Sequence, residues 1–119
     1  MVKDKKIIIY NKTEVQDDIG NWVTAYQPIH PGSLWAYARQ LSQKEYFAAG
    51  TAGYKEDMQF TVNWRRDIKP GMLIYYRETW YVIDRVDTFE GYKEDLKLFA
   101  KEAAQAEIPP ADEIVPYGR

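Results

Sequence analysis

The clearest hydrophobic pattern in the chain lies between residues 58 and 65. Its apolar members point one way and its polar members the other: Met58, Phe60, Val62 and Trp64 against Gln59, Thr61, Asn63 and Arg65. Alternation of aromatic or β-branched residues with polar ones is typical of a strand buried on one face. Pro70 lacks a backbone donor and Gly71 accepts a positive φ, so a turn is predicted to follow.

Other short runs of β-forming residues predict further strands at 7–10, 22–26, 33–40, 72–76 and 79–83. Lysines precede the first run, which favours an edge strand there, and the polar residues 11–21 predict a loop. The last two runs are predicted to pair as a hairpin through Arg77-Glu78. These residues lack the Asn-Gly chemistry of a tight turn, so a three- or four-residue turn is expected.

Residues 33–40 place bulky side chains on one face of a strand and small ones on the other. This is typical of a strand that bends around a small barrel. The expected fold is therefore all-β, a small SH3-like barrel of about six strands. The expected core residues are Trp35, Phe60, Val62, Trp64, Tyr81, Ile83 and Leu96.

Three segments depart from the strand pattern. Ser42 and Glu45 fit a capping box, which predicts a short helical turn near 42–48, before a glycine-containing mobile loop at 51–57. Residues 92–107 carry both helical and strand periodicity, and their good helix formers favour a helix. The proline-rich residues 108–119 predict an extended or disordered tail that orders against a partner, so the predicted domain spans 1–107.

Composition narrows the function classes. The 119 residues suit one domain, and the net charge of −2 lacks the basic field of a nucleic-acid binder. There is no cysteine, so disulfides, thiolate metal sites and cysteine nucleophiles are excluded. The apolar run 7–10 is too short for a signal peptide or a membrane span. Ten Tyr and four Trp suit a barrel core and, for a minority of them, an interface.

No catalytic constellation emerges from the sequence. His30 is the single histidine and is expected to be a surface residue, because no nucleophile elbow accompanies it. Asp84 and Asp87 are expected to be turn carboxylates or partners of Arg85. Arg65 and Arg66 are expected to splay to opposite faces, one of them in a salt bridge, with nucleic-acid contact as the alternative. We predict no catalytic, metal or cofactor site.

An ordered succession of motifs resembles the head–tail joining (head-completion, adaptor or stopper) family of long-tailed bacteriophages and prophages. It covers most of the chain, from residue 7 to 102. The motifs are Trp-Ala at 35–36, Lys-Glu-Tyr-Phe-Ala-Ala-Gly at 44–50, Phe-Thr-Val-Asn-Trp-Arg at 60–65, Ile-Lys-Pro-Gly-Met at 68–72, Tyr-Val-Ile-Asp-Arg-Val at 81–86 and Leu-Lys-Leu at 96–98. Asn63 stands where the family usually has a basic residue, and Arg77-Glu78 lacks the usual hairpin glycine.

The resemblance implies a structural virion protein, not an enzyme, built as a small β-barrel with residues 96–98 in a strand. Family members are often monomers in solution and form a ring, commonly of twelve, beneath the portal and adaptor. That ring closes the DNA-filled head and gives the tail a docking platform. The protein would be in the virion at the head–tail interface, and in the host cytoplasm during assembly. No membrane contact is implied.

The resemblance also implies that residues 42–57 form a loop facing the central channel, where DNA passes without sequence-specific binding. The residues expected in that loop are Tyr46, Phe47, Gly50, Gly53, Tyr54, Lys55, Glu56 and Asp57. Contacts with the ring or with partner proteins are expected at Trp22, Arg65, Arg66 and Tyr117. Two alternatives stay open: a tail-terminator or minor tail protein, and a small β-barrel module that binds peptides or single-stranded nucleic acid.

Overall fold

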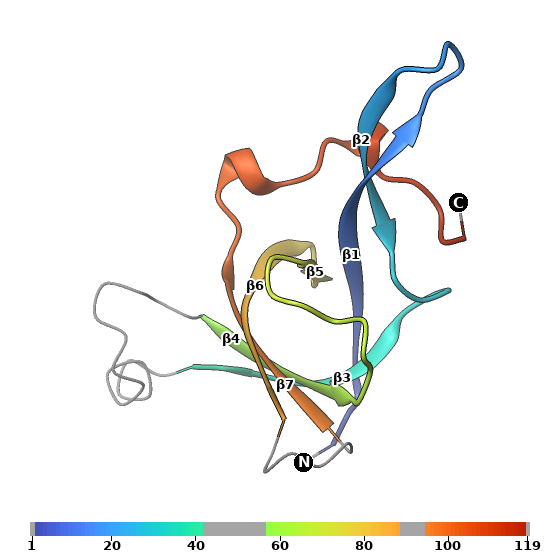
Figure 1. The fold of residues 1–119 in the computed structure, drawn as a ribbon. Coiled ribbons are helices and arrows are strands. Elements are labelled where there is room, and N and C mark those ends of the chain that lie inside the picture. Colours follow the sequence, from blue (N-terminus) through green and yellow to red (C-terminus); the bar gives the residue numbers. More distant parts are fainter. Residues whose placement is uncertain (1, 42–56, 89–94, 119) are drawn as a thin grey trace.

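One strand, β1 (Lys5–Gln16), takes part in two different structures, a barrel and a projecting arm (Figure 1). The computed structural model describes residues 2–41, 57–88 and 95–118. The other strands are β2 (Trp22–Pro28), β3 (Leu34–Gln40), β4 (Met58–Asn63), β5 (Leu73–Tyr76), β6 (Thr79–Thr88) and β7 (Asp95–Glu102). Two 3-10 turns follow, η2 (Gln105–Glu107) and η3 (Ala111–Glu113).

The sheet order is β2-β1-β3-β4-β7-β6-β5, and β5 pairs again with β1. All of these pairings are antiparallel. The additional pairing closes a barrel of six strands and leaves β2 outside it, beside the second half of β1. The expected all-β barrel is confirmed.

The barrel interior is filled by alternate residues of every barrel strand. Phe60 is fully buried, and its ring lies 5.4 Å from that of Tyr76 and 5.6 Å from that of Tyr81, in edge-to-face arrangements. Val62, Ile83 and Leu96 lie in the same core, with Trp64 and Tyr81 packed against it. Ile68, from the loop between β4 and β5, also belongs to this core.

Trp35 is not a core residue, contrary to the expectation, because 55% of its surface is exposed. The register explains why. Ala36 lies opposite Val62 and Ala38 lies opposite Phe60, so the small side chains of β3 face inward and leave room for the Phe60 ring. The bulky face of β3 therefore points away from the barrel interior.

The strand expected at 7–10 is confirmed, but it is not an edge strand, and the loop expected at 11–21 is wrong for residues 11–16. Residues 5–10 lie between β3 and β5, and residues 10–16 pair with β2 from Pro28 to Trp22. The turn is confined to 17–21, where an Asp17 carboxylate oxygen accepts the N–H groups of Ile19 and Asn21 at 3.1 and 2.9 Å. A two-stranded ribbon outside the core needs no alternation of apolar and polar residues. The polar composition of residues 11–21 therefore indicated a loop although residues 11–16 form a strand.

The turn between β5 and β6 has two residues, not three or four. Arg77 and Glu78 adopt φ values of 49° and 62°, the geometry of a primed turn, while Tyr76 pairs with Thr79. The segment from residue 95 is a strand instead of the helix favoured by residue preferences. Leu96 and Leu98 pair with Val62 and Phe60 of β4 and complete the barrel.

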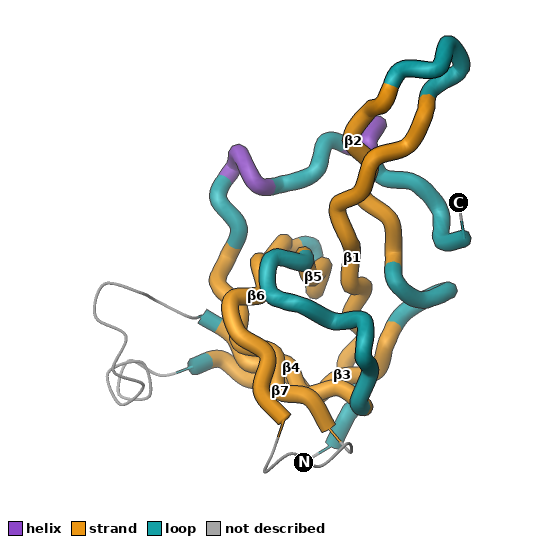
Figure 2. The backbone as a smooth tube through the Cα atoms, in the orientation of Figure 1, coloured by secondary structure: helices purple, strands orange, loops and turns teal. Residues whose placement is uncertain are grey.

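The C-terminal segment packs on the outside of the molecule (Figure 2). The Val115 N–H donates to the Tyr26 carbonyl at 2.9 Å, and Ile114 forms a parallel bridge with Tyr26. Leu73 faces away from the barrel interior, but it lies beside residues of η2 and is only 6% exposed. Residues 108–118 are thus held by the chain itself, not only by a partner. The helical turn predicted at 42–48 lies outside the described residues.

Candidate functional site

In the part of the chain that the structure describes, the candidate sites are surfaces that could contact other molecules. No group of His, Asp and Glu side chains there is arranged to hold a metal ion. Within those residues no helix is long and apolar enough to cross a membrane. His30 is half-buried instead of lying on the surface, and its Nδ1 finds no hydrogen-bond donor or acceptor among the described residues.

One end of the barrel holds both ends of the expected channel loop. The Leu41 N–H donates to the Asp57 carbonyl at 3.0 Å, and the Asp57 N–H donates to the Ala100 carbonyl at 2.8 Å. The Asp57 carboxylate accepts the Glu102 N–H at 2.8 Å. Asp57 is thus an anchor of this loop. The other residues expected to line the channel lie outside the described residues: Tyr46, Phe47, Gly50, Gly53, Tyr54, Lys55 and Glu56.

A cavity of about 470 Å³ opens at this end of the barrel. Charges of both signs line it, among them Lys5, Arg39, Asp57 and Glu102. Burial raises the pKa of the Tyr81 phenol, and the negative charges of Glu102 and Asp57 add to the effect. The phenol therefore stays protonated at neutral pH. Because charges of both signs line this cavity, it is better suited to weak contacts with water or with a polymer than to tight binding of an anion.

Arg65 forms an internal ion pair. Its Nε and one terminal nitrogen donate to the two Asp67 carboxylate oxygens at 2.9 and 2.8 Å, and the latter nitrogen also donates to the Ile29 carbonyl at 3.0 Å. The hydrogen bond from Arg65 holds the pKa of Asp67 below its usual value. This pair ties the β4–β5 loop to the segment after β2. Arg66 is exposed, so the structure shows one arginine in a salt bridge and its neighbour in solvent.

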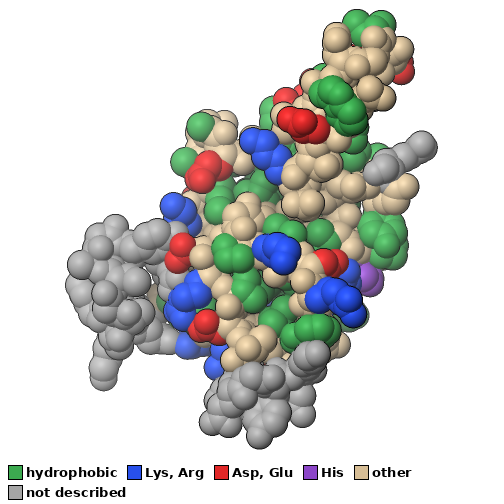
Figure 3. Space-filling model, in the orientation of Figure 1, with side chains coloured by type: hydrophobic (Ala, Val, Ile, Leu, Met, Phe, Trp, Pro, Cys, Tyr) green, Lys and Arg blue, Asp and Glu red, His purple; other side chains and the backbone are tan. Residues whose placement is uncertain are grey.

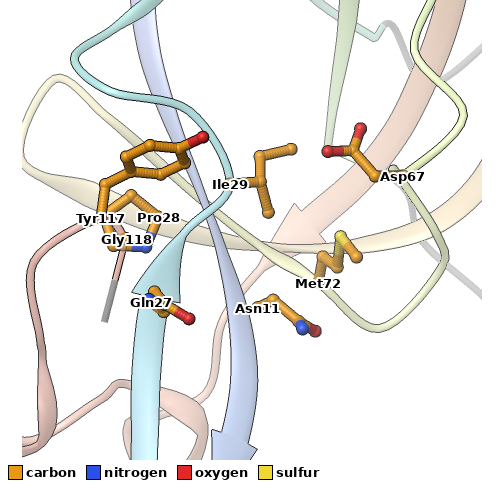
Figure 4. A pocket seen from close by; sticks show the side chains of 8 residues that line it. All are labelled: Asn11, Gln27, Pro28, Ile29, Asp67, Met72, Tyr117 and Gly118. Carbon is orange, nitrogen blue, oxygen red and sulfur yellow. The ribbon is translucent and has the colours of Figure 1, made fainter.

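A second cavity, of about 370 Å³, lies beside this ion pair (Figure 4). Tyr117 and Pro28 line one side of it, and Asp67 and Met72 line the other. The Gln27 side-chain amide donates to the Pro116 carbonyl at 3.4 Å, which holds the tail at the rim. Tyr117 remains 52% exposed. The cavity thus joins the C-terminal segment to the loop carrying Arg65.

The arm formed by β1 and β2 exposes the largest apolar side chains outside the barrel. Trp22 is 65% exposed, Ile19 at the tip is 81% exposed, and Val23 is 41% exposed. Sequence reasoning selected Trp22 and missed the other two. The signal for them was the Asp17-Asp18 and Gly20-Asn21 turn chemistry between two β-forming runs, which predicts a hairpin.

Comparison with known proteins identifies a family for this fold. Residues 4–103 match the family of phage head completion proteins. The match includes six barrel strands and the whole arm. No curated protein matches the chain.

A solved structure shares the fold. The solution structure of protein SF1141 from Shigella flexneri 2a superposes with a TM-score of 0.70 at 19% sequence identity. The similarity covers 85% of this chain and 93% of that one. At this identity, the likeness concerns the fold alone.

Proposed function

The chain belongs to the phage head completion protein family, and on that premise we propose that its copies form a ring beneath the portal or adaptor at the head–tail connector. The family is one of structural proteins of the virion, not of enzymes, and it implies contact with other phage head or tail proteins at the head–tail junction. In our proposal the ring closes the DNA-filled head and offers the tail a docking platform.

The family match over residues 4–103 is the observation that carries this proposal. Two features of the structure support it. The arm exposes Trp22 and Ile19 to solvent, and exposed aromatic side chains are common anchors of protein–protein contacts. The barrel clamps both ends of the segment 42–56 at one mouth, which would hold a channel-facing loop in a defined place.

We further propose that the free protein is a monomer and that DNA passes the ring without sequence-specific binding. Repetition of a weak contact around a ring gives avidity, so no tight pairwise affinity is needed. Asp57 and Glu102 lie at the barrel mouth with Lys5, Arg39 and Arg77, so this surface lacks the strong excess of positive charge that favours tight binding to phosphates.

The test is complementation in a phage that lacks this protein. Heads should then fill with DNA but fail to join tails, and they should lose DNA on storage. Purified protein added to such heads should restore both DNA retention and tail joining. Light scattering of the protein with the cognate portal complex should show a mass increase of several copies per portal.

Two outcomes would contradict the proposal. Heads that retain DNA and join tails without the protein would remove its closure role. A stable ring of the isolated protein that binds tails but ignores the portal complex would instead favour a tail-terminator role.

A further inference from the structure

The arm presents apolar surface that no described residue covers. Ile19, Trp22 and Val23 follow one another along its outer half, and all three are exposed to solvent. The ribbon stands away from the barrel (Figure 1), so these side chains add nothing to the barrel core. Exposed tryptophan is among the residue types most enriched where binding energy concentrates.

Charge separates the arm from the rest of the molecule. Residues 13–27 carry three carboxylates, Glu14, Asp17 and Asp18, and no lysine or arginine, which gives a charge of −3. Lys12, at the base of the arm, brings residues 10–28 to −2, so the rest of the chain carries −2 − (−2) = 0. Figure 3 shows acidic and hydrophobic side chains on the arm, a blue side chain at its base and further blue side chains over the barrel. The acidic outer part of the arm is complementary in charge to a surface that exposes a lysine such as Lys6, and such complementary surfaces favour head-to-tail association of copies.

The outer face of β3 and its neighbours is the second surface. Lys6 pairs with Trp35 across β1 and β3, and its ammonium lies 5.2 Å from the centre of the Trp35 ring. On β6 and β7, the Arg85 guanidinium lies 3.9 Å above the Phe99 ring and is also paired with Asp87. The C-terminal segment is held at β2 and does not bury Trp35, which stays 55% exposed.

We propose that the arm of one copy docks on the Lys6–Trp35 face of a second copy. This inference rests on the proposed ring and specifies which surfaces of neighbouring subunits meet in it. The contact joins two different surfaces, and such heterologous contacts generate rings when the rotation closes. An arm–arm contact is disfavoured because it would bring two acidic arms, each of charge −2, together. Contact within one chain is excluded, since the ten residue-to-residue steps from Lys6 to Gln16 span about 33 Å of extended strand.

Cysteine cross-linking tests this contact directly, because the chain has no cysteine of its own. The variant Ile19→Cys, Asn63→Cys carries one thiol on the arm and one beside Trp35, since Ala36 pairs with Val62 in the β3–β4 register. Lys6 and Trp35 stay intact. The matched control, Ile19→Cys, Lys69→Cys, places the second thiol on an exposed turn elsewhere.

Mild oxidation of the portal-bound protein should give a ladder of trimers and larger species for the Asn63→Cys pair. Each single variant should stop at dimers, because it carries one thiol per copy. The control should form markedly fewer trimers and larger species than the Asn63→Cys pair, because its second thiol lies away from the proposed contact. The same reaction is run on the free protein at its highest soluble concentration. Added salt should reduce the ladder there, since screening weakens attraction between exposed charges.

The outcomes separate the contact from the ring. Portal binding without a ladder beyond the control would overturn the arm–face contact and leave the proposed ring in place. A ladder in the free protein without portal binding would retain the contact and overturn the ring beneath the portal. Absence of both would overturn both.

Discussion

The two regions that β1 joins, the barrel and the arm, use apolar residues in opposite ways. In the barrel, Ile7 and Ile9 are each 1% exposed and belong to the core. In the arm, Gln16 of β1 pairs with Trp22 of β2, which is 65% exposed. Burial of apolar surface in the barrel stabilises the fold, at about 25 cal/mol per Å². The apolar surface of the arm contributes little to stability and is available to a partner.

The largest predicted effect is a loss of stability in the barrel. Phe60→Ala removes a fully buried ring that contacts Tyr76 and Tyr81. The free energy of unfolding should fall by about 3–5 kcal/mol, as for other large-to-small core changes. Urea denaturation followed by tryptophan fluorescence measures it. A fall below about 1 kcal/mol would show that the barrel interior is not the main source of stability.

A smaller loss should follow removal of residues 108–119. The truncation deletes the Val115–Tyr26 hydrogen bond and uncovers apolar surface beside β2. We expect the free energy of unfolding to fall by roughly 2 kcal/mol, the burial of about one apolar side chain. An unchanged denaturation midpoint would mean that the tail is not held by the chain in solution, as first expected from its prolines.

The Arg65–Asp67 pair should have an effect of about 1 kcal/mol, because both groups are partly exposed and screened by solvent. Arg65→Ala removes the hydrogen bonds to Asp67 and to the Ile29 carbonyl. Arg65→Lys should recover only part of the loss, since an ammonium lacks the two-pronged geometry of a guanidinium. Equal stability of Arg65→Lys and the parent protein would contradict this account.

The same pair predicts a pH dependence. The pKa of Asp67 is lower in the folded protein than in the unfolded chain. Its stabilisation is therefore present above the unfolded pKa of about 4 and is lost as the pH falls through the folded pKa. Asp67→Asn should flatten that part of the stability profile. Identical acid profiles for Asp67→Asn and the parent would rule out this contribution.

The smallest effect on stability is expected on the arm. Trp22→Ala should change the free energy of unfolding by less than about 0.5 kcal/mol, as is usual for exposed positions. Lys69→Ala, another exposed position, serves as the control. A loss comparable to that of Phe60→Ala would show that Trp22 belongs to the folded core after all.

Strands could be predicted from the sequence where burial of one face makes apolar and polar residues alternate. The strand containing Phe60 and Val62 could be predicted because one face must enter the barrel. The same rule failed at Trp35, since the register across β3 and β4 decides which face points inward. The strand at 96–98 was ambiguous from composition and was fixed by its pairing with two neighbours.

The candidate sites were harder to predict than the fold. Arg65 and Tyr117 lie beside one cavity although the chain separates them widely, and no local pattern signals that proximity. Arg77 and Glu78 adopt a tight turn without its usual residues, because the pairing of β5 with β6 sets the geometry. The arm carries no burial pattern because it lies outside the core, so its signal in the sequence was the turn chemistry of residues 17–21 between two β-forming runs.

The most direct test of the division between barrel and arm is head–tail joining by Trp22→Ala, measured with DNA-filled heads that lack this protein. The account predicts a denaturation midpoint equal to that of the parent and joining reduced by at least about tenfold, which corresponds to 1.4 kcal/mol of binding free energy. Lys69→Ala should join heads and tails as the parent does. Full joining activity of Trp22→Ala would contradict the assignment of assembly to the arm.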